Sequence, residues 1–119
     1  MTLPTLPAPV PAYLAATNHA DIEALMATFA EDALVNDHRD DFAGRDVIRN
    51  WAQREIVDDR VTIQVTGSTC RGNTAAVTAS IDGNFDKTGL PDPLVLAIYF
   101  SVSDERIVQL IIVHNKPAD

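Results

Sequence analysis

The sequence predicts an α+β fold, in which helices pack on one face of a curved, mostly antiparallel sheet. Apolar residues in the first half recur with the period of helices, whereas from Val61 onward they alternate with polar residues, as in strands. Helices followed by a run of strands that tight turns connect are typical of this class. The 119 residues are the length of one domain, and we interpret 1–119 as a single unit.

The N-terminal segment is expected to be an extended arm followed by the first helix. Prolines at positions 4, 7, 9 and 11 favour extended backbone, so residues 1–9 are interpreted as a proline-rich arm. Pro11 suits the first turn of a helix, which we expect to end near Thr17 or Asn18.

Two more helices are predicted, with a short strand and a polar loop between them. Asp21 is suited to cap the earlier helix, because its side chain can accept a hydrogen bond from a free backbone N–H. The strand covers Ala33 to Asp37, the loop Arg39 to Ala43, and the later helix Arg45 to roughly Val57. Apolar residues at helical spacing form the expected core: Ile22, Leu25, Met26 and Phe29, then Val47, Ile48, Trp51, Ala52 and Ile56.

Four strands are predicted in the second half of the chain. In the first of them, Val61, Ile63 and Val65 alternate with polar residues. The other three cover Thr74 to Asp82, Leu94 to Val102 and Ile107 to His114, with turns at 71–73 and 103–106 and a long Gly- and Pro-containing loop from Gly83 to Pro93.

Charge and composition disfavour several classes of partner. The formal net charge is −8 and the nine basic residues are scattered, whereas proteins that bind nucleic acid cluster Lys and Arg against phosphates. The longest apolar run, Leu94 to Phe100, is far shorter than a membrane-spanning helix. The N-terminus lacks the basic and continuous apolar regions of a secretory signal, and Cys70 is the single cysteine. We therefore expect a cytoplasmic protein that binds neither nucleic acid nor membrane.

The chain resembles the nuclear-transport-factor-2-like superfamily from about Val10 to Asn115. The resemblance rests on the Asp-capped helix and on the segments FAEDALVND, GRDVIRNW and IVQLIIVHN. SnoaL-like polyketide cyclases and ketosteroid isomerases are the members most similar in pattern. The resemblance implies a cone, made of a sheet wrapped around three helices, with a deep internal pocket. It leaves function open, because this fold hosts isomerases, cyclases, dehydratases and non-catalytic modules.

Ketosteroid isomerase supplies a residue-by-residue expectation. It uses a tyrosine donor on the first helix, an aspartate that moves the proton, and a second, protonated aspartate. An ungapped match places Tyr13 at the tyrosine and Asp37 at the proton-transferring aspartate, whereas the second aspartate falls near Ile98 and is absent. The resemblance thus implies Asp37 and Tyr13 as catalytic residues and requires no cofactor.

The chemistry of both candidates can be argued from their residue types. Burial in an apolar pocket disfavours a charged carboxylate, which suits Asp37 to accept a proton; the alternative is a solvated Asp that opens the DHRDD turn. A phenol held by a helix can donate to an enolate or carbonyl oxygen, which suits Tyr13; the alternative is a core aromatic with its hydroxyl at the rim.

Other residues are candidates for lining the pocket. Phe29 and Trp51 are expected as packing residues that form its apolar wall, and Tyr99 and His114 as ligand-binding residues on long strands. In a regular strand His38 would point to the face opposite Asp37, so it is interpreted as a rim or surface residue.

Metal and nucleophilic chemistry find little support. The order of ligand types in DHRDD matches no spacing that fixes a coordination geometry, so no metal site is predicted. The sequence contains no strained serine elbow and no phosphate-binding glycine motif.

Two further expectations concern surfaces. The segments from about Leu94 to Val113 are apolar on both faces, so we expect their outward face to form a homodimer. The long loop from Gly83 to Pro93 is expected at the pocket mouth or the dimer edge, with more mobility than the strands that it joins.

Two classes of function remain open. The first is a cofactor-independent isomerase, cyclase or dehydratase that moves a proton next to a carbonyl of a small apolar molecule. The second is a non-catalytic ligand-binding or dimerisation module of the same fold. The absent second acid favours the second class, whereas Tyr13 and Asp37 favour the first.

Overall fold

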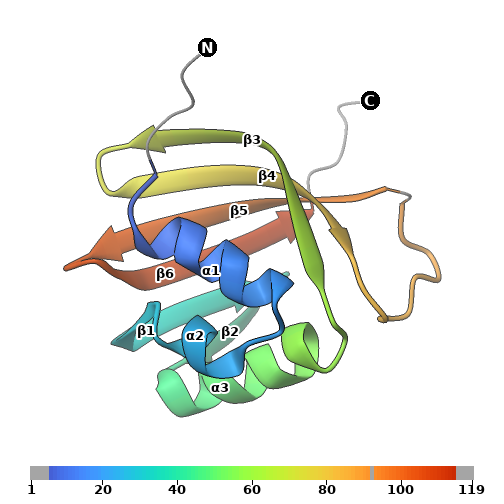
Figure 1. Cartoon of the computed structure of the whole chain (residues 1–119), viewed down its shortest axis with the longest axis horizontal. Coiled ribbons are helices and arrows are strands. Elements are labelled where there is room, and N and C mark those ends of the chain that lie inside the picture. The colour runs from blue at the N-terminus through green and yellow to red at the C-terminus, as the bar shows by residue number, and fades with distance from the viewer. Residues whose placement is uncertain (1–5, 92, 115–119) are drawn as a thin grey trace.

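Three helices lie against one six-stranded sheet in the computed structural model, which describes residues 6–91 and 93–114 (Figure 1). The fold class is α+β, as predicted. The helices are α1 (Pro9–Asn18), α2 (Ile22–Met26) and α3 (Arg45–Ala52), and a π-helical turn (Gln53–Val57) continues α3. The strands are β1 (Phe29–Asp37), β2 (Asp40–Ala43), β3 (Thr62–Arg71), β4 (Thr74–Asp82), β5 (Leu94–Ser103) and β6 (Arg106–His114).

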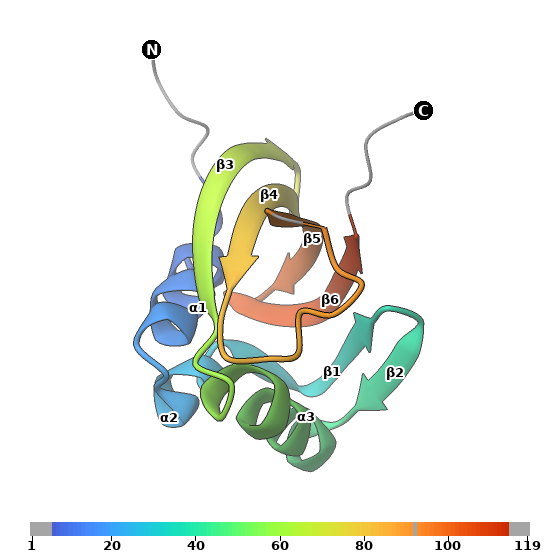
Figure 2. The ribbon, with the colours of Figure 1, turned by 90° about the vertical axis from the view of Figure 1, so that its right-hand side faces the viewer.

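The strand order in the sheet is β2-β1-β6-β5-β4-β3. Adjacent strands run antiparallel, except that β1 and β6 are parallel. The strands follow an arc, and the helices lie along its inner side (Figure 2). Within the described ranges no helix has the length and the apolar character that crossing a membrane requires.

The N-terminal helices differ from the prediction mainly at their ends. Helix α1 begins at Pro9, so Pro11 lies in its first turn as predicted, while the predicted arm of residues 1–9 extends one residue too far; residues 1–5 lie outside the described residues. Asp21 caps α2 as predicted, because its Oδ1 accepts from the N–H of Ala24 at 3.1 Å. The helix ends at Met26, so the placement of Phe29 in it was wrong: Phe29 is the first residue of β1.

The predicted loop from Arg39 to Ala43 is instead a hairpin turn followed by β2, which is a correction to the sequence analysis. Asp37 pairs with Asp40 across the two-residue turn of His38 and Arg39, both of which have positive φ, at 53° and 79°. Such a turn matches the twist of the two strands that it joins. The polar sequence of β2 lacks the apolar alternation by which a strand is predicted.

The core lies between the helices and the inner side of the sheet. Tyr13, Phe29 and Phe100 are at most 1% exposed, and their rings meet edge to face, with centroids 6.1 Å apart for Tyr13–Phe29 and 5.3 Å apart for Tyr13–Phe100. Edge-to-face contacts of this kind add to the energy of burial. They hold the Tyr13 ring in one position on α1.

Candidate functional site

The parallel pairing of β1 and β6 brings the ends of two distant segments together. Asp37 pairs with Ile112, and the N–H of His38 donates to the Ile112 carbonyl at 3.1 Å. Because parallel strands end at the same edge of a sheet, His114, two residues further along β6, lies beside His38. Their ring centroids are 4.2 Å apart and the rings are nearly perpendicular.

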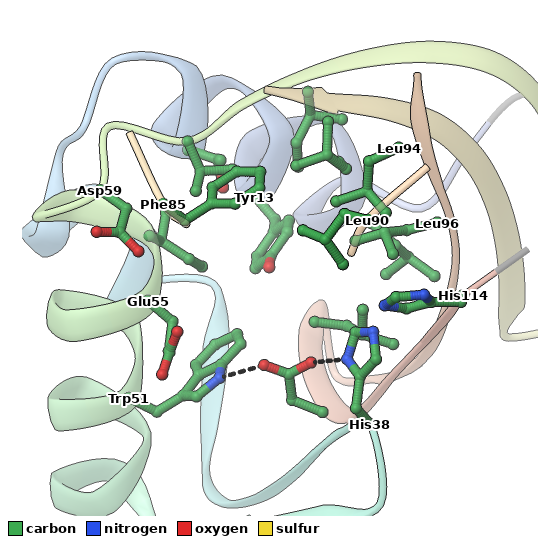
Figure 3. A pocket seen from close by; sticks show the side chains of 18 residues that line it. Tyr13, His38, Trp51, Glu55, Asp59, Phe85, Leu90, Leu94, Leu96 and His114 are labelled. Atoms are coloured by element: carbon green, nitrogen blue, oxygen red, sulfur yellow. Dashed lines mark hydrogen bonds and ion pairs between the residues drawn. The ribbon is translucent and has the colours of Figure 1, made fainter. Parts of the chain in front are cut away.

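The carboxylate of Asp37 is held by two donors. Its Oδ2 accepts from the indole N–H of Trp51 at 3.0 Å, and its Oδ1 lies 2.5 Å from Nδ1 of His38. An ionised carboxylate only accepts, so Nδ1 of His38 is the donor in this pair. The Asp37 side chain is 23% exposed, and Figure 3 shows both contacts as dashed lines.

Helix α3 positions the indole. Gly44, with φ of 87°, precedes the helix, and Trp51 lies on its buried face with 1% exposure. The indole also contacts the ring of Phe42 on β2, with centroids 6.1 Å apart. A wall of two aromatic rings therefore fixes the direction in which the indole N–H points.

The hydroxyl group of Tyr13 enters the site from α1. In Figure 3 the Tyr13 side chain points into the cavity that Trp51 and His38 border from the other side. Burial raises the pKa of the Tyr13 phenol above its ordinary range, and the negative charge of Asp37 raises it further, while the Thr17 hydroxyl acts in the opposite direction. Tyr13 is thus kept protonated, as a hydrogen-bond donor must be.

These groups line a cavity of about 260 Å³ whose remaining walls are mainly aliphatic. Ile98 and Leu96 of β5 and Ile112 of β6 contribute to the walls. Phe85 and Leu90, from the segment between β4 and β5, also line the cavity, and in Figure 2 this segment crosses the open end of the arc. The loop prediction is therefore right in its location at the pocket, while its mobility stays a prediction.

Two more acids, Glu55 and Asp59, lie at the α3 side of the same cavity (Figure 3). Over the described ranges, no group of three or more His, Cys, Asp or Glu side chains is arranged to hold a metal ion. The Asp37 carboxylate has the chemistry to accept a proton, and the protonated Tyr13 hydroxyl has the chemistry to donate to an oxygen.

Residues 10–110 match the family model described as the SnoaL-like domain. The chain belongs to the SnoaL-like domain family. The match covers nearly all of the three helices and of the sheet, in agreement with the resemblance found in the sequence.

Solved structures of similar proteins agree with the SnoaL-like assignment. A candidate polyketide cyclase from Sinorhizobium meliloti is 31% identical, with a TM-score of 0.81 over 91% of this chain and 95% of that chain. A candidate polyketide cyclase from Xanthomonas campestris pv. campestris is 26% identical, with a TM-score of 0.75 over 90% and 87% of the two chains.

A third structure shares the fold alone. A candidate ketosteroid isomerase from Kribbella flavida has a TM-score of 0.77 over 95% of this chain and 79% of that chain, but only 18% of the residues are identical. Among curated proteins, none matches the sequence.

The structure of this SnoaL-like chain brings together four of the six residues proposed for the site. Asp37, Tyr13, Trp51 and His114 all line the cavity. Phe29 is buried against the Tyr13 ring and is not among the residues that line the cavity.

Tyr99 is also outside the cavity, because neighbouring residues of a strand point to opposite sides. Its neighbours Ile98 and Phe100 are buried, whereas Tyr99 is 42% exposed on the outer side of β5. The expectation that Phe29 and Tyr99 border the pocket is thereby corrected.

The sequence analysis missed His38 and Thr17 as residues of the site. His38 was expected to point away from Asp37, but its φ of 53° breaks the alternation of β1 and turns the ring towards the Asp37 carboxylate. The adjacent Asp37 and His38 are a possible signal of this pair in the sequence, but the two side chains can meet only because of the turn between β1 and β2. Thr17 lies one helical turn after Tyr13, so the face of α1 that it shares with Tyr13 could have been inferred from the spacing.

Proposed function

We propose that this SnoaL-like protein is a cofactor-independent enzyme of the isomerase, cyclase or dehydratase type, which moves a proton next to a carbonyl of a small apolar substrate. Asp37 is the base and Tyr13 donates to the carbonyl oxygen. One observation carries the proposal. The Asp37 carboxylate, which is hydrogen-bonded to Trp51 and His38, lines the same mainly apolar cavity as the buried hydroxyl group of Tyr13.

The contacts of Asp37 suit a proton-transferring group. Trp51 and His38 each donate one hydrogen bond to the carboxylate. Each carboxylate oxygen can accept more than one hydrogen bond. The carboxylate therefore keeps a fixed orientation while it retains lone pairs for a substrate proton. A base that is already oriented avoids the entropic cost of being positioned during the reaction.

The position of Tyr13 suits the charge that develops on the substrate. When Asp37 takes the proton from the carbon beside the carbonyl, the electron pair of that C–H bond forms an enolate and the negative charge moves to oxygen. A neutral phenol donates to this oxygen more strongly in the transition state than in the ground state. The proton then returns from Asp37 to a carbon or oxygen of the same substrate, so that no co-reactant is consumed.

The test is exchange of protons beside a carbonyl with solvent deuterium. Small cyclic ketones, such as indanone and tetralone, fit the size and apolar character of the cavity and can be followed by NMR. We expect the wild type to accelerate exchange over buffer. Asp37→Asn should lower the rate by about 10²–10⁴-fold, and Tyr13→Phe by about 10²–10³-fold.

Asp32→Asn is the matched control, because Asp32 is an exposed acid on the same strand and does not line the cavity. It should exchange protons at the wild-type rate. Equal rates for wild type and Asp37→Asn would refute the assignment of Asp37 as the base.

A non-catalytic ligand-binding module is the second candidate, and Ile98 is the residue that favours it. Ile98 is 2% exposed and lines the cavity at the position where the ketosteroid isomerase pattern places its second acid. Saturable binding of the ketones without any acceleration of exchange would support this function in place of catalysis.

A further inference from the structure

We propose that Thr17 and Tyr13 together form a two-hydroxyl site on α1 for one oxygen of the ligand, an enolate or phenolate oxygen in its charged form. This inference rests on the proposed function, which it deepens by naming a second donor. It places that donor on α1, at a residue that takes no part in the proton transfer proposed for Asp37.

The first support is the state of the Thr17 hydroxyl. Thr17 is 1% exposed and lines the cavity, and its Oγ1 is buried without a well-formed hydrogen bond to any described residue. Buried hydroxyl groups nearly always have a partner, because burial without one costs free energy. The Thr17 hydroxyl acts on the neighbouring Tyr13 phenol and lowers its pKa, but it forms no well-formed hydrogen bond there, so it remains available to a molecule in the cavity.

The contrast with Thr28 shows that this state is particular to Thr17. Thr28 is buried to a similar degree, at 5% exposure, but its hydroxyl donates to the Leu25 carbonyl at 2.7 Å. This is the usual arrangement of a threonine near a helix end. The two residues differ in that only Thr17 borders the cavity.

The second support is the geometry of α1. Tyr13 and Thr17 are four residues apart, so their side chains lie next to each other on one face of the helix. Both border the cavity, and both side chains carry one O–H donor. A carbonyl or enolate oxygen has enough lone pairs to accept from two donors at once.

The walls of the cavity also explain why a second donor would come from the helix. Ile98 and Ile112 face the cavity from the sheet and offer no donor. Asp37 and the two neighbouring histidines occupy the β1 and β6 edge, where the proton is removed. The α1 side is left for the oxygen, so the reacting carbon would lie between the hydroxyl pair and Asp37.

The test uses p-nitrophenol, whose absorbance separates phenol from phenolate, as a small planar mimic of an enolate. All variants are made in an Asp37→Asn chain, because Asn has the neutral charge that Asp37 has after it has taken the proton. Thr17→Val removes the hydroxyl at nearly constant shape, Thr17→Ser retains it, and Thr28→Val is the matched control. Binding is measured by titration, and the melting temperature of each variant by circular dichroism.

We expect Thr17→Val to weaken p-nitrophenolate binding by about tenfold or more, as loss of a donor to a charged oxygen does, and Thr17→Ser to preserve binding. Thr17→Val should also keep or raise the melting temperature, because it buries a methyl group in place of a hydroxyl that has no well-formed hydrogen bond. Thr28→Val should do the reverse, with a lower melting temperature and unchanged binding.

Three results would overturn the inference. These are p-nitrophenolate binding that Thr17→Val leaves unchanged, a melting temperature that Thr17→Val lowers as Thr28→Val does, and the absence of saturable binding to the Asp37→Asn chain. The ketone exchange assay is independent of these measurements. Loss of the two-donor site with Asp37-dependent exchange intact would leave the proposed function standing, and the converse result would leave a binding site without catalysis.

Discussion

The buried phenol of Tyr13 predicts how the stability of the protein depends on alkaline pH. Tyr13 is 1% exposed, and burial together with the charge of Asp37 raises its pKa above the ordinary value of about 10. Below about pH 10 the phenol is protonated in the folded and the unfolded chain and has no effect on the pH dependence. Above it the unfolded chain releases the proton while the folded chain retains it.

The size of the effect follows from linkage. The unfolded chain binds about one proton fewer than the folded chain, so the free energy of unfolding falls by about 1.4 kcal/mol for each pH unit above about 10. The fall continues until the pH passes through the raised pKa of the folded state. Tyr13→Phe removes this contribution, and the difference in slope between the two proteins isolates it from the other titrating groups.

Urea denaturation from about pH 9 to about pH 11 measures that slope difference, around the ordinary phenol pKa of about 10. The sequence has only two tyrosines, so in Tyr99→Phe the near-ultraviolet absorbance of tyrosinate reports Tyr13 alone. We expect this absorbance to appear together with the loss of folded structure. Tyrosinate that forms at about pH 10 in a chain that is still folded would refute the reasoning.

Four other predictions test the packing, the site and the surface. Asn18→Ala should destabilise the fold by about 1–3 kcal/mol in urea denaturation, because the Asn18 side chain accepts from the N–H of Ile63 on β3 at 2.7 Å and donates to the Ile63 carbonyl at 3.1 Å. Trp51→Phe should cost about 1–3 kcal/mol and slow ketone exchange, because Phe cannot donate to Asp37; unchanged exchange would show that this bond is not needed. Sedimentation should give twice the 12.9 kDa chain mass if the outer face of 94–113 forms a homodimer, and a monomer at micromolar concentration would refute it. Hydrogen exchange should be faster in the loop of residues 83–91 than in β5, and equal protection would contradict the predicted mobility.

The fold could be predicted from the sequence because its elements follow simple periods. The Asp21 cap, the start of α3 at Arg45 and the bounds of β4 are as the residue pattern indicates. The pattern failed at Phe29, where an apolar residue that continues a helical stripe instead begins a strand. Burial alone satisfies both interpretations, and the pairing of Phe29 with Ile107 decides between them.

The candidate site could be predicted only in part, because it depends on contacts between distant segments. Asp37 and Tyr13 came from a resemblance, and the structure places both at one cavity. The contact of His38 with His114 follows from the parallel register of β1 and β6, which no local period specifies. The Thr17 hydroxyl lacks a well-formed hydrogen bond because of how its neighbours are positioned in space, which spacing along one helix does not report.

The position of β6 between β1 and β5 has a consequence for the order in which a nascent chain can fold. Until residues 106–114 leave the ribosome, both neighbouring strands present open edges and the inner face of the sheet is incomplete. Pairings across such long sequence separations form slowly and leave intermediates prone to aggregation. The contact between His38 and His114 forms only when β6 docks. The rim of the cavity is therefore completed in the same step as the sheet, so a half-synthesised chain cannot bind a ligand there as the finished protein would.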